Sequence, residues 1–263
     1  MATSSIGIDF TGRVAVVTGA AGGIGAGLVD ALAHCGAQVL ALDRNGRALI
    51  AAHQQSPYTG LVSTREVDVS DWDQVAGAAE TANETWGRLD VWINCAGVFP
   101  NAPLLQITPA GLAATMSVNL AGAVAGAQAA APYLSEGTGS VLNISSIAAT
   151  RARPGRMEYS ASKAALEQAT RCLAVELAPR GIRANAIAPG YIETAMLSWI
   201  HRDSLTTAQA IEEVPLHRIG SVEDIVAAAL FLISDAASYI TGAVLPVDGG
   251  LRVAGSQIPN LAQ

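Results

Sequence analysis

The chain alternates between short apolar runs typical of buried strands and longer segments with the apolar spacing of helices. Strands separated by helical crossovers are most simply joined in parallel, with helices covering both faces of the sheet. We therefore predict an α/β fold with one doubly wound parallel sheet of about seven strands. The expected strands are Arg13–Thr18, Ala37–Leu42, Leu61–Val67, Leu89–Asn94, Gly139–Ser145, Arg183–Ala188 and Ala243–Val247.

Helices are expected between these strands. The first follows a glycine-rich turn and runs through Cys35, and another carries Tyr159 and Lys163. The others are expected at Asn45–Gln55, Asp71–Trp86, Pro109–Leu134, Glu193–Leu216 and Val222–Ile233. No linker divides the 263 residues, so we expect a lead-in at 1–12, one domain at 13–250 and a tail at 251–263.

The composition disfavours several classes of protein. A net charge of −7 argues against a nucleic-acid partner, which needs a clustered positive surface. Cys35, Cys95 and Cys172 have no metal-ligand spacing and are interpreted as buried thiols in a reducing compartment, which favours the cytoplasm. The histidines have no ligand-like spacing either, so no metal is expected. We expect no secretory signal, and no apolar stretch reaching the ~18 residues of a membrane span.

A glycine motif lies where the first strand passes into the first helix. Gly19, Gly23 and Gly25, with Ile24 between the last two, leave backbone N–H groups open to a pyrophosphate at a helix N-terminus. Asp43 follows at the end of the second strand, where a carboxylate accepts hydrogen bonds from ribose hydroxyls and repels a 2′-phosphate. The motif predicts a dinucleotide site that prefers NAD to NADP.

Two alternatives stay open at the end of the second strand. Arg44 is a counter-signal, because a guanidinium could stack on adenine or hold a phosphate. Asp43 could also be a simple turn residue before Asn45 and Gly46.

Tyr159 and Lys163 are one helical turn apart and so share a helix face. A free tyrosine loses its proton near pH ~10, and an ammonium nearby favours the phenolate. We therefore expect Lys163 to bring Tyr159 toward use as a base near neutral pH. Ser146 follows a buried strand, where its hydroxyl would lie at the carboxyl edge of the sheet.

Ser146, Tyr159 and Lys163, together with the segment Thr18–Gly25, resemble the classical short-chain dehydrogenase/reductase family over about Arg13–Gly250. The resemblance implies a Rossmann-like fold and hydride transfer between an alcohol carbon and nicotinamide. It makes Tyr159 the base, Ser146 the group that fixes the substrate oxygen, and Lys163 a ligand of the nicotinamide ribose as well. Asn119 matches the fourth catalytic residue of the family, which anchors a water for proton release.

The resemblance implies further cofactor contacts. Asp68 and Val69 match an adenine-contacting pair, and Asn94-Cys95-Ala96-Gly97 matches the family's Asn-Asn-Ala-Gly motif with Cys95 as a departure. In the turn Pro189-Gly190-Tyr191-Ile192-Glu193-Thr194, the Ile192 backbone and the Thr194 hydroxyl would hold the carboxamide.

For the substrate, the resemblance implies a lid at 193–217, with Tyr191 and His201 as further contacts. Arg151 and Arg153 stand where family members face the substrate, and two guanidiniums would suit a carboxylate, phosphate or sulfonate. A solvated loop with intersubunit ion pairs is the alternative. The alanine- and glycine-rich segment Leu120–Pro132 predicts either a dimer or tetramer, as in the family, or tight packing on its own sheet.

The function expected is an NAD-dependent dehydrogenase of a small polar alcohol or sugar hemiacetal, and a carboxylated or sulfonated sugar would use the arginines. A 3-oxoacyl thioester reductase is the alternative, disfavoured by Asp43 because that reaction usually runs on NADPH. A catalytically dead dinucleotide sensor or scaffold protein is a second alternative, which the intact Tyr159 and Lys163 argue against.

Overall fold

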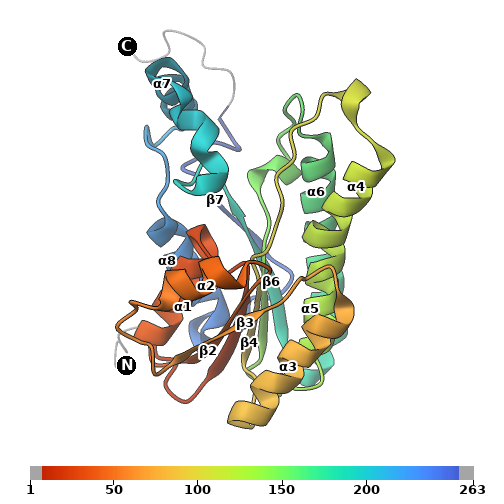
Figure 1. Cartoon of the computed structure of the whole chain (residues 1–263), viewed down its shortest axis with the longest axis vertical. Helices are drawn as coiled ribbons and strands as arrows, with labels where there is room; N and C mark the ends of the chain where they lie inside the picture. Colours follow the sequence, from red (N-terminus) through yellow and green to blue (C-terminus); the bar gives the residue numbers. More distant parts are fainter. Residues whose placement is uncertain (1–7, 255–263) are drawn as a thin grey trace.

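Seven strands form one parallel sheet in the order β3-β2-β1-β4-β5-β6-β7, as the sequence predicts (Figure 1). The computed structural model describes residues 8–254, and of residues 199–202 it gives the backbone alone. The order reverses between β1 and β4, where open α/β sheets place their ligands. The strands are β1 (Val14–Thr18), β2 (Gln38–Asp43), β3 (Val62–Glu66), β4 (Val91–Asn94), β5 (Ser140–Ile144), β6 (Arg183–Pro189) and β7 (Val244–Val247).

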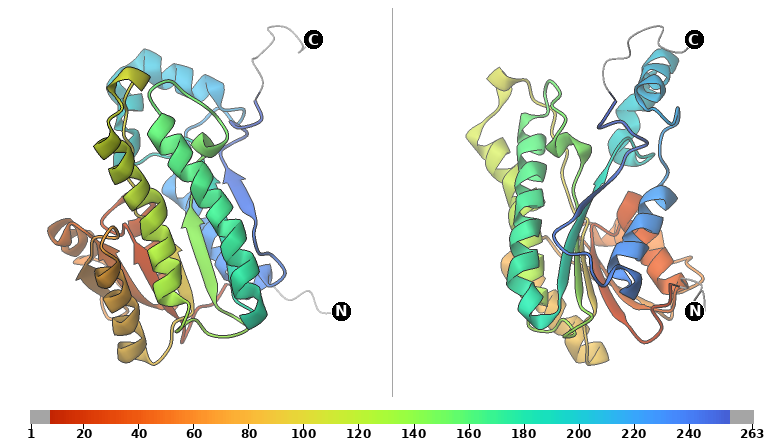
Figure 2. Two further views of the ribbon diagram at one scale, coloured as in Figure 1. Left: turned by 90° about the vertical axis from the view of Figure 1, so that its right-hand side faces the viewer. Right: turned by 180° about the vertical axis from the view of Figure 1, so that it is seen from behind.

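Helices cover both faces of the sheet (Figures 1 and 2). One face carries α1 (Gly23–His34), α2 (Gly46–His53) and α8 (Val222–Ile233). The other carries α3 (Trp72–Trp86), α5 (Gly122–Ala130) and α6 (Met157–Leu177). The helix α7 (Ser204–Glu213) stands beyond the sheet, toward the top of Figure 1.

Each face of the sheet has its own hydrophobic core, because side chains alternate along a strand. In β1, Ala15 and Val17 join the core beneath α1 and α8, whereas Val14 and Val16 join the core beneath α3 and α5. This burial on both faces explains why the strands read as continuous apolar runs in the sequence.

The helix predicted at Pro109–Leu134 differs from the structure in its middle. It comprises α4 (Pro109–Met116), a π-helical turn, η2 (Ser117–Ala121), and α5. The wider turn contains Asn119, whose buried amide hydrogen-bonds both backbone groups of Val98 at 2.8 and 3.0 Å. Single π turns occur frequently at functional sites.

The segment predicted as helical at Glu193–Leu216 divides into two helices. A 3-10 helix, η5 (Ala195–Arg202), precedes α7, and Asp203 caps α7 by accepting the Thr206 N–H at 2.7 Å. Other 3-10 turns are η1 (Leu104–Gln106), η3 (Ile147–Ala149), η4 (Ala178–Arg180) and η6 (Asp235–Ala237).

The expectation that no segment reaches the length of a membrane span is wrong as stated. Pro109–Ala130 is long and apolar enough by length and composition to cross a membrane. Its second half, α5, packs on Trp92 of β4 and on α3, and its buried residues are all alanine or glycine. The same packing accounts for its alanine and glycine content.

Gly126 of α5 offers a test of this packing. A Cβ there would lie 2.3 Å from Trp92 Nε1 and 2.4 Å from Asn94 Oδ1, two atoms that hydrogen-bond each other at 2.8 Å. Gly126→Ala should therefore lower the free energy of unfolding by ~1–3 kcal/mol through overpacking, although alanine gains ~1 kcal/mol of helix propensity.

Gly77→Ala in α3 is the matched control, because a Cβ there meets only the end of the flexible Arg65 side chain at 3.2 Å. It should be neutral or stabilising in chemical denaturation. Equal stability of the two variants would show that α5 can shift away from the sheet.

Candidate active site

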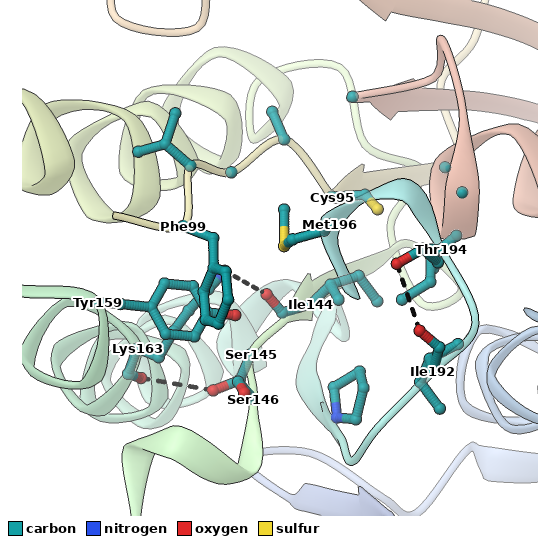
Figure 3. A pocket seen from close by; sticks show the side chains of 18 of the residues that line it. Cys95, Phe99, Ile144, Ser145, Ser146, Tyr159, Lys163, Ile192, Thr194 and Met196 are labelled. Atoms are coloured by element: carbon teal, nitrogen blue, oxygen red, sulfur yellow. Dashed lines mark hydrogen bonds between the residues drawn. The ribbon is translucent and has the colours of Figure 1, made fainter. Parts of the chain in front are cut away.

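A cavity of about 420 Å³ opens at the carboxyl ends of the central strands, where the strand order reverses. Its wall draws on the ends of β1, β2, β4, β5 and β6, on α6, and on the segment that enters η5 (Figure 3). Nearly every residue that the sequence assigned to cofactor or substrate lines it. Among the described side chains the exception is Asn94, and the catalytic candidate Asn119 does not line the cavity either; the side chain of His201 lies outside the described residues.

The glycine loop fits a pyrophosphate. A Cβ on Gly19 would lie 2.7 Å from the Ala96 backbone, and one on Gly25 would lie 2.1 Å from the Gly19 carbonyl oxygen. Gly23 has a φ of 54°, and a Cβ there would meet the Thr194 side chain at 3.2 Å. No side chain caps the N-terminus of α1, so its first N–H groups remain available to an anion.

Asp43 hydrogen-bonds the glycine loop and also lines the cavity. Its carboxylate accepts the Ala21 N–H at 3.1 Å and the Asn45 N–H at 2.9 Å, so it is a turn residue that also lines the cavity. Arg44 and Asp68 lie beside it in the wall. The pKa of Asp68 is lowered, first by hydrogen bonds from Ser70 and to a smaller extent by the charge of Arg44. Two carboxylates thus face one guanidinium at this end.

The residues of the Asn94–Gly97 turn have different roles. Ala96 and Gly97 line the cavity, and the N–H groups of Cys95 and Ala96 donate to Thr18 Oγ1 at 3.0 and 3.1 Å. The amide of Asn94 instead donates to the Ala123 carbonyl and to Asn143, and accepts from Trp92. The structure therefore places Asn94 in a buried brace behind the cavity wall. Burial raises the pKa of the Cys95 thiol to about 12, so it is not a nucleophile there.

The turn after β6 closes the opposite side of the cavity. Pro189, Gly190, Ile192 and Thr194 all line it, and the Thr194 hydroxyl donates to the Ile192 carbonyl at 3.3 Å (Figure 3). A Cβ on Gly190 would lie 2.7 Å from Asp248 Cα, so only glycine fits this turn beside β7.

Tyr159 and Lys163 lie buried side by side on α6, next to Ser146 at the end of β5 (Figure 3). Lys163 Nζ donates to the Ile144 carbonyl at 2.8 Å and stands 5.8 Å from the centre of the Tyr159 ring. The Ser146 side chain lies near enough to Tyr159 to lower its pKa, and its Oγ accepts the Ala148 N–H at 3.1 Å. The three residues expected to perform catalysis therefore meet at one point of the wall.

The electrostatics of the pair differ from the sequence expectation. Burial raises the pKa of Tyr159, while the hydrogen bond from Ser146 and the charge of Arg156 oppose that rise. The lowering effect that the sequence assigned to Lys163 comes instead from these two groups. Lys163 is itself buried, which lowers its pKa to about 8.

Asn119 lies just behind the wall. Besides Val98, its amide donates to Ser162 Oγ at 2.9 Å, and that hydroxyl donates to the Tyr159 carbonyl at 2.7 Å. A Cβ on Gly97 would lie 3.3 Å from Asn119 Oδ1 and 3.6 Å from Lys163 Nζ. Asn119 thus links the π turn to α6 in the immediate neighbourhood of the lysine.

The two arginines expected to contact the substrate are held by one carboxylate. Arg151 and Arg153 both pair with Glu213 Oε2 of α7, the first at 3.2 Å. Tyr191 OH donates to the same oxygen at 3.0 Å, and the Arg153 guanidinium lies 5.2 Å from the Tyr191 ring centre. The two arginines line the cavity, and each forms an ion pair with Glu213.

Sequence reasoning missed several residues of the wall. Phe99, Met196 and Arg156 line the cavity, and Glu213 holds the arginines from outside it. Arg156 stands one helical turn before Tyr159, a spacing that could have drawn attention to it. Nothing in the local sequence signals the role of Glu213, which is 62 residues from Arg151.

Comparison with known proteins agrees with this geometry. A family model described as enoyl-(acyl carrier protein) reductase matches residues 19–252. The chain belongs to the classical short-chain dehydrogenase/reductase family. A crystal structure of a member from Brucella melitensis, titled glucose/ribitol dehydrogenase, superimposes with a TM-score of 0.88 and 32% identity, covering 92% of this chain and 98% of that one.

Curated relatives of this family member have diverse names. A 3-oxoacyl-[acyl-carrier-protein] reductase of Thermotoga maritima is 38% identical, over 92% of this chain and 98% of its own length. Gluconate 5-dehydrogenase of Gluconobacter oxydans is 36% identical, with coverages of 93% and 96%. Cis-4-hydroxycyclohexanecarboxylate dehydrogenase of Sinomonas cyclohexanicum is 38% identical, with coverages of 93% and 98%. The chain is an oxidoreductase of CH–OH groups. The substrates that the names of these relatives denote differ from one relative to the next.

The buried lysine predicts a pH-dependent stability. The pKa of Lys163 is about 8 in the folded chain and ~10.4 when unfolded, so the unfolded chain binds more protons in between. Wild-type stability therefore gains from rising pH over this window, a gain that Lys163→Met lacks. The free energy of unfolding of the variant relative to wild type should fall by about 2–3 kcal/mol between pH 8 and 10.

Chemical denaturation at both pH values measures this difference. Loss of the hydrogen bond to Ile144 lowers the stability of the variant equally at each pH and does not affect the comparison. Arg171→Met, which removes an exposed cation from the same helix, is the control and should show no such dependence. A constant difference between Lys163→Met and wild type would mean that Lys163 stays protonated above pH 10.

Proposed function

We propose that this chain is an NAD-dependent dehydrogenase of a small polar alcohol or sugar hemiacetal that carries an anionic group. The meeting of Ser146, Tyr159 and Lys163 in a cavity that begins at the glycine loop is the observation that carries the proposal. Bound nicotinamide would accept or give the hydride. Gly19, Gly23 and Gly25 would hold the pyrophosphate, and Ile192 and Thr194 would hold the carboxamide.

The proton chemistry falls to the residues of α6 and β5. In oxidation, Tyr159 Oη removes the proton of the substrate hydroxyl as the hydride leaves, so the base must touch that oxygen. Ser146 donates a hydrogen bond to the same oxygen and fixes its position. Lys163 would hold positive charge beside the tyrosine and bind the nicotinamide ribose. Asn119 would anchor a water that leads protons from the lysine to solvent.

The charges at the adenine end support NAD. Asp43, Asp68 and Arg44 all line that end of the cavity. The charge of Arg44 lowers the pKa of Asp68 slightly, and a 2′-phosphate bound there would be repelled by two carboxylates. Asp43 still has lone pairs for ribose hydroxyls, because each of its oxygens accepts one N–H in the structure.

Two observations support an anionic substrate. Three arginines line the substrate end of the cavity against one carboxylate, Glu213. The names of two relatives, gluconate 5-dehydrogenase and cis-4-hydroxycyclohexanecarboxylate dehydrogenase, denote carboxylate substrates. A sugar acid or another small hydroxy acid would satisfy both. The lid of this site would be residues 193–217, with His201 among its contacts.

A 3-oxoacyl thioester reductase is the second candidate, favoured by the 38% identical Thermotoga maritima relative. It would run in the reductive direction on NADPH, so the preferred dinucleotide separates the candidates. A cytoplasmic homodimer or homotetramer is proposed for either function. The small residues of α4, most of which are not buried within the chain, would let a second subunit approach closely. The absence of a cysteine pair among the described residues supports the cytoplasm, although Cys172 is exposed and not buried as the sequence suggested.

The cofactor preference is directly measurable. By calorimetry, NAD should bind at least about tenfold more tightly than NADP, a difference of ~1.4 kcal/mol. Asp43→Asn, which removes the charge but keeps an acceptor, should narrow the gap because the 2′-phosphate is no longer repelled. Arg47→Gln in α2 removes a nearby charge outside the cavity and is the control. Equal or tighter NADP binding by wild type would favour the reductase.

The assigned base gives a sharper test. Tyr159→Phe should lose nearly all turnover and keep its affinity for the dinucleotide, because it deletes only the titrating hydroxyl. Tyr239→Phe, at a fully exposed tyrosine outside the cavity, should behave as wild type. If Tyr159→Phe keeps a tenth or more of the wild-type rate, another group removes the proton.

A further inference from the structure

Arg156 is a cavity arginine with no acidic partner in the described part of the chain. Its one hydrogen bond there runs from Nη1 to the Pro100 carbonyl at 3.1 Å. Arg151 and Arg153, by contrast, both end on Glu213, and Arg44 lies beside Asp68. Most of the guanidinium N–H groups of Arg156 are therefore free to bind a ligand.

An aromatic stack connects this cation to the Tyr159 ring. The Arg156 guanidinium lies 3.8 Å from the centre of the Phe99 ring. That ring meets the Tyr159 ring edge to face, with centres 4.6 Å apart (Figure 3). A guanidinium over an aromatic face is attracted by the ring and keeps a fixed plane. Its charge is also one of the influences that lower the pKa of Tyr159, after burial, which raises it, and Ser146.

The surroundings of Arg156 favour a bound anion. The guanidinium is half-buried, and burial lowers its pKa. Val98, Ile147 and Leu197 contribute apolar side chains to the wall of the same cavity. A cation in such a site gains from an opposite charge that is also desolvated, and the planar fork of arginine matches a carboxylate or sulfonate.

We propose that Arg156 binds the anionic group of the substrate, and that Arg151 and Arg153 instead hold α7 beside the cavity through Glu213. This inference rests on the proposed dehydrogenase function and names the residue that would select its substrate. Only the Phe99 ring separates the Arg156 guanidinium from the Tyr159 ring. An anionic group bound to Arg156 would therefore lie close to the reacting carbon. The substrate class is then a short hydroxy or keto acid, or its sulfonate counterpart.

Two arms test the inference. In the first, propane-1-sulfonate is titrated by calorimetry into wild type, Arg156→Gln, Arg156→Lys and Arg153→Gln, with and without NADH. Wild type should bind the probe, Arg156→Gln should bind it about tenfold or more weakly, and Arg156→Lys should fall between. Arg153→Gln should change the affinity much less.

In the second arm, rates with NAD are compared for 3-hydroxybutyrate and its uncharged methyl ester. Arg156→Gln should raise the KM of the acid about tenfold or more while kcat changes less, and it should leave the KM of the ester within about threefold. Arg171→Gln, from the exposed side of the same helix, should change neither. Thermal unfolding confirms that each variant folds. If Arg156→Gln does not fold, the KM values of Arg156→Lys for the acid and the ester decide the result.

The outcomes separate this inference from the proposed function. Failure of wild type to bind the sulfonate, equal affinity in Arg156→Gln, or a loss confined to Arg153→Gln overturns the role of Arg156, even if the enzyme oxidises neutral alcohols with NAD. Conversely, sulfonate binding that depends on Arg156, in a protein that binds no dinucleotide, keeps the anion site and rejects the dehydrogenase.

Discussion

The close contact between the ends of β1 and β4 is the constraint on which the rest of the structure depends. At Gly19 the chain passes so near the Ala96 backbone that a Cβ would lie 2.7 Å from it, and Thr18 Oγ1 accepts the N–H groups of Cys95 and Ala96. This contact fixes the point where the strand order reverses. The uncapped N-terminus of α1 and the small residues after β4 therefore border the same crevice, which continues past β5 to α6.

Burial of the Tyr159 and Lys163 pair follows from the position of α6 over that crevice. Burial acts against the charged form of each, raising the pKa of the tyrosine and lowering that of the lysine. The pair is therefore sensitive to any charge that comes near, and the groups that lower the pKa of the tyrosine are Ser146 and Arg156. Buried titratable neighbours share protons as a unit, so their pH dependence belongs to the pair.

The sequence predicted the sheet well because buried parallel strands read as apolar runs whatever surrounds them, and the glycine and Tyr-Lys spacings are local. It could not predict which side chains pair across long separations. The amide of Asn94 is used by Trp92, Ala123 and Asn143, and the two predicted anion ligands are occupied by Glu213, which comes from α7. The π turn at Asn119 likewise depends on a contact with Val98, from another part of the chain.

The arrangement of charge in the cavity joins these observations. At the end beside β2, the carboxylates of Asp43 and Asp68 line the cavity with Arg44, and at the other end Arg151, Arg153 and Arg156 line it, the first two paired with Glu213. The cavity is thus negative at one end and positive at the other, within a chain whose net charge is −7. The proposed ligands, a dinucleotide without a 2′-phosphate and a small anionic substrate, would each carry a charge that suits its end of the cavity. The 2′-phosphate of a phosphorylated dinucleotide would be repelled by the two carboxylates, and a neutral acyl thioester would leave the arginines at the other end without a charged partner. This electrostatic difference favours the proposed dehydrogenase over the reductase.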